Sequence, residues 1–129
     1  MKMRDRANQL RVNHKEWRNY NFSHKEGFFP LFSDFKNEMK FLSPGAVSLF
    51  VYFGLHSNNV TGECSHSLET IAHNLNRSIR TISNWVKELE SNQLIERIQL
   101  DFNSSSRTFI IPYTKRYSDE KSVMENDLF

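Results

Sequence analysis

In the second half of the chain, apolar residues first recur every three or four positions and then alternate with polar ones. Within Ser78–Leu89, the residues Ile82, Val86 and Leu89 stand at i, i+4 and i+7, which is the spacing of one helix face. Ser78 can cap this helix, because its hydroxyl can accept from a free backbone N–H of the first turn. The pattern predicts a short amphipathic helix with a polar face.

A second short helix is predicted just before it, over Ser67–Leu75, with Ser67 as its cap. Its apolar side chains face inward: Leu68, Ile71, Ala72 and Leu75. Only Asn76 and Arg77 separate the two helices. They must therefore meet at a steep angle, which is the geometry of a helix-turn-helix.

Beyond the second helix the periodicity changes from that of a helix to that of a strand. Leu94–Asp101 alternates apolar and polar residues, and Arg107–Tyr113 does so more loosely. The polar sequence FNSSS lies between them. Two alternating segments around a short polar loop predict a two-stranded hairpin placed directly after the helix pair.

Upstream of the helix pair, Ser43 and Pro44 mark the start of another helix, as N-cap and first helical residue. This helix, from Pro44 to about His56, is apolar on nearly every side, so it must be covered on every side. Phe28–Met39 is rich in phenylalanine and contains Pro30. It predicts an extended segment followed by a short helix or turn near Ser33–Glu38.

The helix pair can cover only one face of this apolar helix. Either Phe28–Phe35 or a second subunit must cover the other, and a homodimer is the preferred prediction. Its expected interface consists of Phe28, Phe29, Phe32, Leu49 and Phe53. In the alternative, the phenylalanines fold back and complete the core of a monomer.

The run S-x-x-x-I-A-x-x-L-x-x-S-x-R-T-I-x-x-W-V-x-E-L-E-x-x-x-L-I-E-R resembles the winged helix-turn-helix domains of bacterial transcription regulators. It is also similar to the DNA-binding modules of plasmid and phage replication proteins. The resemblance covers roughly residues 42–113 and implies a mainly α fold with a small β-hairpin wing. Such domains usually have glycine where this chain has Gln93, so the helix is expected to end with Asn92 in the left-handed conformation.

The expected organisation is a basic N-terminal arm (1–27), a winged helix-turn-helix domain (28–113) and a short acidic C-terminal tail (114–129). The resemblance implies sequence-specific binding of double-stranded DNA, with the second helix in the major groove and the hairpin on the flanking backbone or minor groove. A transcription regulator and a replication or transfer accessory of a mobile element both remain open. The alternative is a protein–protein interaction module on the same scaffold.

The residue types on the second helix and hairpin suit these roles. Arginine can bond guanine and asparagine can bond adenine, each through two hydrogen bonds, whereas phosphate contacts position the protein without reading sequence. The expected base-reading residues are Arg80, Thr81, Ser83 and Asn84. The expected phosphate contacts are Arg77, Lys87, Ser104, Ser105, Ser106 and Arg107.

Charge is distributed unevenly, although the whole chain is only +2. Residues 1–27 carry seven Lys or Arg against three acids, and residues 77–116 carry seven against four. The last thirteen residues carry one against four. A basic arm and a basic second half are what a nucleic-acid surface requires.

The arm also contains Trp17, Tyr20 and Phe22, and three interpretations of it are open. It could be a tail, disordered or partly helical, whose aromatic residues dock on the domain. It could contact DNA, as basic arms do, or exchange with a partner chain. The cations that would contact DNA are Arg4, Arg6, Arg11, Lys15 and Arg18.

Other functions find little support. One cysteine allows no intramolecular disulfide, which fits a cytoplasmic protein. The charged N-terminus predicts no secretory signal, and the longest apolar run, Leu49–Leu55, is too short to span a membrane.

The sequence also gives no sign of catalysis or of a bound cofactor. Three histidines and the cysteine lie close in sequence but without the paired spacing of a zinc site: His56, Cys64, His66 and His73. There is no glycine-rich phosphate loop and no catalytic set. We therefore expect no enzyme, cofactor, metal or small-molecule ligand. Trp85 is expected in the core, or else on the helix flank near DNA.

Overall fold

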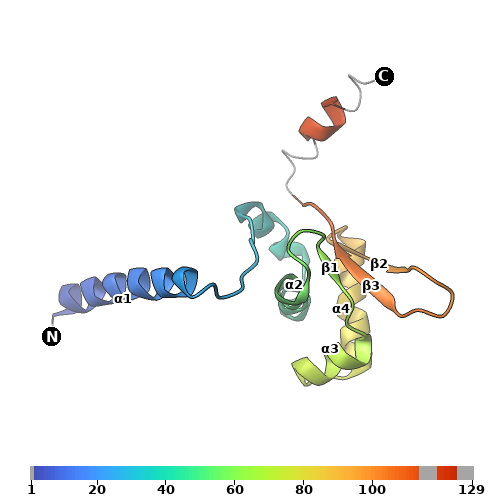
Figure 1. The fold of residues 1–129 in the computed structure, drawn as a ribbon, viewed down its shortest axis with the longest axis horizontal. Coiled ribbons are helices and arrows are strands. Elements are labelled where there is room, and N and C mark those ends of the chain that lie inside the picture. Colours follow the sequence, from blue (N-terminus) through green and yellow to red (C-terminus); the bar gives the residue numbers. More distant parts are fainter. Residues whose placement is uncertain (1, 114–118, 125–129) are drawn as a thin grey trace.

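The computed structural model describes residues 2–113 and 119–124. Helices α2, α3 and α4 pack together beside a small sheet, and α1 lies apart from them (Figure 1). Residues 119–124 form a short helix, and the rest of the expected acidic tail lies outside the described residues. The elements are α1 (Met3–Ser23), 3-10 turns at Ser33–Asn37 and Met39–Phe41, α2 (Pro44–His56), β1 (Glu63–Cys64), α3 (Leu68–Leu75), α4 (Ile79–Ser91), β2 (Ile95–Gln99) and β3 (Ser106–Ile110).

The three helices of the domain begin where the sequence predicts. Ser43, Ser67 and Ser78 are the N-caps of α2, α3 and α4. Each hydroxyl accepts from the backbone N–H three residues later, at 3.1–3.2 Å. These bonds satisfy one of the free donors of each first turn. The 3-10 turn at Ser33–Asn37 likewise confirms the turn predicted there.

The end of α4 differs from the prediction. Asn92 is not left-handed, because its φ is −94°, and Gln93 instead takes the left-handed conformation with φ 59°. The Asn92 side chain donates to the carbonyl of Glu88 at 2.8 Å, which occupies the amide at the helix end. Gln93 thus stands in the position where related domains use glycine, and it adopts the conformation that glycine would provide.

The predicted hairpin is present, but it belongs to a three-stranded antiparallel sheet in the order β1-β3-β2. In the β2–β3 pair, Ile95 lies opposite Ile110 and Gln99 opposite Ser106. The additional strand, β1, contains only Glu63 and Cys64 and pairs with β3. Two residues are too few to show an alternating pattern, so this strand could not be predicted from periodicity.

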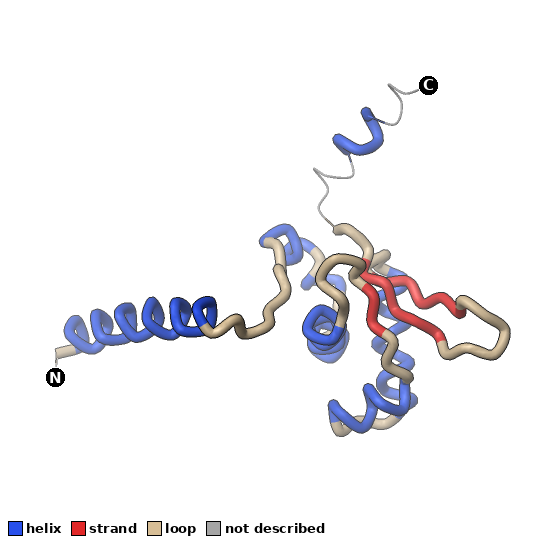
Figure 2. The backbone as a smooth tube through the Cα atoms, in the orientation of Figure 1, coloured by secondary structure: helices blue, strands red, loops and turns tan. Residues whose placement is uncertain are grey.

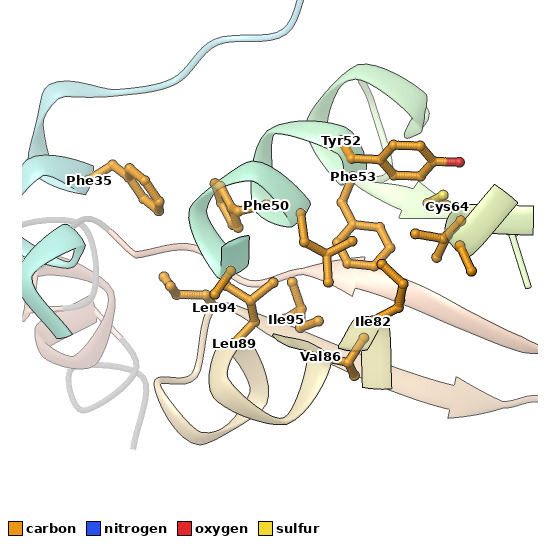
Figure 3. Close-up of a cluster of buried hydrophobic side chains, with 14 residues drawn as sticks. Phe35, Phe50, Tyr52, Phe53, Cys64, Ile82, Val86, Leu89, Leu94 and Ile95 are labelled. Atoms are coloured by element: carbon orange, nitrogen blue, oxygen red, sulfur yellow. The ribbon is translucent and has the colours of Figure 1, made fainter. Parts of the chain in front are cut away.

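Helix α2 lies at the centre of the core (Figure 3), and the stripe Ile82, Val86 and Leu89 of α4 is buried against it, as predicted. The dimer prediction was wrong for two residues of α2. Leu49 and Phe53 have no exposed surface at all, because they lie inside the hydrophobic core of the chain. They cannot contribute to a contact with a second chain.

The segment 28–35 partly follows the fold-back alternative. Phe35 stacks on Phe50 of α2 with ring centroids 4.6 Å apart. The Phe29 ring lies so close to Gly54 that an added Cβ would be 2.3 Å from it. Phe28 and Phe32 remain 59% exposed. This segment therefore completes the core with two of its phenylalanines and leaves two on the surface.

The N-terminal arm is a continuous helix from Met3 to Ser23 with none of its residues buried. Figure 2 shows this helix standing away from the domain, joined to it by an extended segment. Trp17, Tyr20 and Phe22 are each more than half exposed. The Phe22 ring meets the Phe28 ring edge-on at 5.5 Å, and this is a contact with the connecting segment. The aromatic residues of the arm are therefore not docked on the helices of the domain.

Candidate nucleic-acid interface

The turn between α3 and α4 is as short as the sequence predicts. Asn76 ends α3 in the left-handed conformation, with φ 53° and ψ 52°, a conformation that asparagine tolerates better than most residues. The N–H of Arg77 donates back to the carbonyl of Ala72 at 3.0 Å. This closure turns the chain sharply, so that α4 crosses α3 and one of its faces is free.

The free face of α4 carries a row of polar residues opposite the buried stripe. Arg80, Asn84 and Lys87 are exposed and follow one another at i, i+4 and i+7, so they share one side of the helix. No acidic residue falls in this row. Thr81 and Ser83 lie on the two flanks and are half-buried. The row can donate several hydrogen bonds to bases or phosphates, and it places Lys87 beside the expected base-reading residues.

The expected base-reading hydroxyl of Thr81 already has a partner. It accepts a hydrogen bond from the Ser78 hydroxyl at 2.9 Å, within the cap of α4. Arg77, expected on phosphate, is exposed, and its guanidinium donates to the carbonyl of Asn76 at 2.9 Å. Both groups keep further donors, so these local bonds orient them without using all of their capacity.

Two contacts hold α4 against α2. Glu88 accepts from both the backbone N–H and the hydroxyl of Ser43, at 2.9 and 2.7 Å. The Trp85 ring packs against Gly45, where an added Cβ would lie 2.0 Å from the indole. Trp85 is half-buried and packs against the core, which confirms the core interpretation of this residue. The polar row of α4 is therefore presented by a helix with a defined position.

The expected phosphate contacts of the wing fall into two groups. Arg107 forms an ion pair with Glu63 of β1 at 2.6 Å, so part of its charge is already neutralised. The Ser104 hydroxyl accepts from the N–H of Asp101 and donates to its carbonyl, which stabilises the loop. Ser105 is exposed and Ser106 is half-buried in β3. Ser105 is the freest donor among them.

Two exposed apolar residues, one in α4 and one in the wing, were missing from the sequence prediction. Ile79, in the first turn of α4, is 46% exposed, and Phe102, in the loop of the wing, is 95% exposed. Ile79 fits the spacing of the buried stripe, so periodicity alone assigns it to the core. Phe102 is the one apolar residue of the loop sequence FNSSS, so its exposure could have been predicted from the sequence. Apolar side chains at such positions can contact thymine methyl groups or sugar.

A small hydrogen-bonded cluster connects α2 with α3. The Asn74 amide donates to the Tyr52 hydroxyl at 2.9 Å, and this hydroxyl lies 2.5 Å from Nδ1 of His66. Burial, and then the nearby His56, lower the pKa of His66 below its ordinary value. Burial likewise raises the pKa of Tyr52. Both shifts favour neutral groups, so the cluster fits a structural role between the helices.

The sheet contains a similar polar contact. The Arg97 guanidinium donates to the Thr108 hydroxyl across β2 and β3 at 2.7 Å. Thr108 is fully buried, and burial lowers the pKa of Arg97, opposed by Glu90 and other charges. Arg97 is therefore occupied inside the fold. Within residues 2–113 and 119–124, no three His, Cys, Asp or Glu side chains are grouped to hold a metal ion. None of the described helices is long and apolar enough to cross a membrane.

Comparisons with known proteins agree with this geometry. Residues 40–95 match a sequence family described as a helix-turn-helix domain. A search of curated proteins found no match. Among solved structures, the chain is similar to one described as "Structure of Rep-DNA complex", with 16% identity and a TM-score of 0.51. That similarity covers 83% of this chain and 93% of the other.

A second solved structure, described as "N-Terminal domain of DNA binding protein", has 17% identity and a TM-score of 0.48, covering 83% of this chain and 92% of the other. The family match spans α2, β1, α3 and α4, and the strands β2 and β3 follow it directly. Residues 40–95 are therefore similar to a helix-turn-helix domain, and together with the hairpin they give the chain a winged helix-turn-helix fold.

Proposed function

We propose that this protein binds double-stranded DNA at specific sequences, with α4 in the major groove and the wing on the neighbouring backbone or minor groove. The observation that carries the proposal is the exposed row Arg80, Asn84 and Lys87 on the helix face opposite the core. It offers donors suited to guanine, adenine and phosphate. A helix-turn-helix presents its second helix to DNA in this way.

The roles within the row differ. Arg80 and Asn84 lie one turn apart and would face base edges, with Ser83 and Thr81 on the flanks. Lys87, Arg77 and Ser105 would hold phosphates, and Arg107 would do so after exchanging Glu63 for a phosphate. Ile79 and Phe102 would add apolar contacts. One structural neighbour is described as a Rep–DNA complex, which is in keeping with DNA as the partner.

The cellular role depends on which DNA sequence the protein recognises, and the fold does not determine that sequence. A regulator of transcription and a replication or transfer accessory of a mobile element both require such a module, and we propose the protein acts in one of these two roles in the cytoplasm. We further propose that it binds as a homodimer. Two reading helices about 34 Å apart would then recognise a pseudo-palindromic site.

The test begins with selection of bound duplexes from a random library, which yields the preferred sequence and its symmetry. Affinity is then measured for that site and for random duplex at two salt concentrations. Arg80→Ala should weaken binding to the preferred site by about 1–3 kcal/mol and relax specificity at one base position. Lys36→Ala, which removes an exposed cation outside the proposed interface, should have little effect.

Two results would contradict the proposal. An equal loss on the preferred site and on random DNA would show that Arg80 contacts only phosphate. Failure to bind any duplex at low salt would reject DNA binding altogether, because non-specific affinity is strongest there. The scaffold would then be better explained as a protein–protein interaction module.

A further inference from the structure

Helix α1 presents apolar side chains to water along its whole length. It has 21 residues and none of them is buried, although most of the stability of a helix in a protein comes from packing of its apolar face. Met3, Leu10 and Trp17 are 88%, 51% and 63% exposed. Apolar side chains that lie in one stripe on a helix mark an interaction surface.

Three of these apolar residues have the spacing of a coiled-coil seam. Met3, Leu10 and Trp17 are each seven residues apart, which places them at one repeated position of a heptad. Ala7, His14 and Asn21 fall between them at the second seam position. Met3, Leu10 and Trp17 thus form one apolar stripe along α1, although His14 and Asn21 between them are polar and the exposed Val12 lies on the opposite face. A seam of this kind is covered by another helix lying along it.

A row of arginines flanks the seam on one side. Arg4, Arg11 and Arg18 each follow a seam residue directly, at the position that sets partner choice in coiled coils. The acids of α1, Asp5 and Glu16, lie on the opposite face. Among the residues that the structure describes, no ion pair joins these arginines to a carboxylate. Within the described part of the chain, the row is a positive stripe without a carboxylate partner, although Arg18 lies over the Phe22 ring at 5.3 Å and Arg11 donates to the Asn8 side chain at 2.7 Å.

A second copy of α1 does not fit this surface. In an antiparallel pair the flanking rows would meet, with Arg11 against Arg11 and Arg4 against Arg18. In a parallel pair Arg6 would face Arg11. Like charges at these positions act against pairing. DNA would neutralise the arginines but would leave the apolar seam in water. A helix with acidic flanks covers both stripes.

We propose that α1 is a docking helix for a partner protein, and that its ligand is an amphipathic helix with an apolar seam flanked by glutamate or aspartate. The partner's seam packs on Met3, Leu10 and Trp17, and its acidic residues pair with the arginine row. This surface is separate from the polar row of α4. The inference therefore stands whether or not the domain binds DNA.

The test uses the full-length chain and two labelled synthetic peptides of three heptads. Both have isoleucine and leucine in the seam, and one has glutamate and the other lysine at all flanking positions. Fluorescence anisotropy should show binding of the acidic peptide and none of the basic one. Each peptide is monomeric by its own charge repulsion, which keeps the measurement simple.

Variants then separate specific docking from general attraction. Replacing Arg4, Arg11 and Arg18 together by glutamate should weaken binding of the acidic peptide about tenfold or more and should create binding of the basic peptide. A matched control replaces Lys25, Lys36 and Lys40 by glutamate. These lysines are exposed and lie outside α1, so the same change of net charge should leave the preference intact.

A further variant, Leu10→Asn, should lower the affinity for the acidic peptide, because it places a polar side chain in the seam. Circular dichroism checks that the α-helix content is unchanged. The proposal is overturned if neither peptide binds, or if the lysine control loses as much affinity as the arginine variant. It also fails if Leu10→Asn dissociates a self-associated protein, because the seam would then belong to a second copy. Loss of DNA affinity in the arginine variant, without peptide binding to the parent, would assign the row to phosphate.

Discussion

Gln93 holds a backbone conformation that is unfavourable for a residue with a side chain. Its φ of 59° is in the left-handed region, which glycine enters readily and glutamine does not. Gln93→Gly should therefore raise the free energy of unfolding by about 0.5–1 kcal/mol, measured by urea denaturation. The neighbouring variant Asn92→Gly is the control. Asn92 has φ −94° and bonds the helix end, so its replacement should destabilise; a gain there would refute this explanation.

His66 should make the stability of the domain depend on pH. Burial, with His56 nearby, lowers the pKa of His66 in the folded protein below the ordinary 6.5, so the unfolded chain binds the proton more readily. A lower pH therefore favours the unfolded state. The free energy of unfolding should fall as the pH drops below about 6.5 and recover above it. The Tyr52 hydroxyl, which accepts from Asn74, is free to donate to neutral His66.

The measurement is the free energy of unfolding from about pH 5 to pH 7.5. His66→Gln should flatten the curve in this range, whereas His73→Gln, which changes an exposed histidine of α3, should not. An unchanged slope in the His66 variant would mean that this side chain does not contribute. Because His66 is only partly buried, the effect is expected to be modest.

At the scale of the elements, the orientation of α4 depends on its contact with α2. Gly45→Ala places a Cβ about 2.0 Å from the Trp85 ring, so Trp85 must move or α4 must shift. The expected loss is about 1–3 kcal/mol in the free energy of unfolding, as for other overpacked cores. DNA affinity should fall as well, since α4 presents the reading residues. Gly27→Ala has open space around it and should change neither quantity; equal losses in both variants would contradict the packing argument.

The elements that were predicted correctly share a local cause. The caps Ser43, Ser67 and Ser78 and the stripe of α4 can be read from neighbouring residues, because a helix is specified by short-range spacing. Two residues of β1 have no such signal and depend on pairing with a distant strand. The burial of Leu49 and Phe53 could not be predicted for the same reason, because the residues that pack on them are distant in the sequence.

The candidate site shows the same division. Residue type and helix spacing identified Arg80 and Asn84, which lie together on the free face. They could not show that Arg107 is paired with Glu63, forty-four positions away, or that the Thr81 hydroxyl takes part in a cap. They also gave no role to Ile79, because its exposure depends on where the packing of α4 begins.

At the scale of the whole molecule, Phe28 and Phe32 are what remains of the predicted dimer surface. Both are 59% exposed, and covering them would contribute about 1.5–3 kcal/mol each. We expect a dimer at micromolar concentration in sedimentation, and a monomer when both are replaced by serine. Phe102→Ser removes an even more exposed phenylalanine from the wing and should leave assembly unchanged. A parent protein that stays monomeric at high concentration would rule out this interface.

The single cysteine allows the opening of strand β1 to be measured. Cys64 lies in β1 opposite Thr108 and is 1% exposed, so a thiol reagent can reach it only when the edge of the sheet opens. The rate of modification under native conditions therefore measures how often this edge detaches. Conversely, a fluorophore coupled to Cys64 would prevent β1 from pairing with β3. Probes for single-molecule work therefore belong at an engineered cysteine elsewhere, in a Cys64→Ala background.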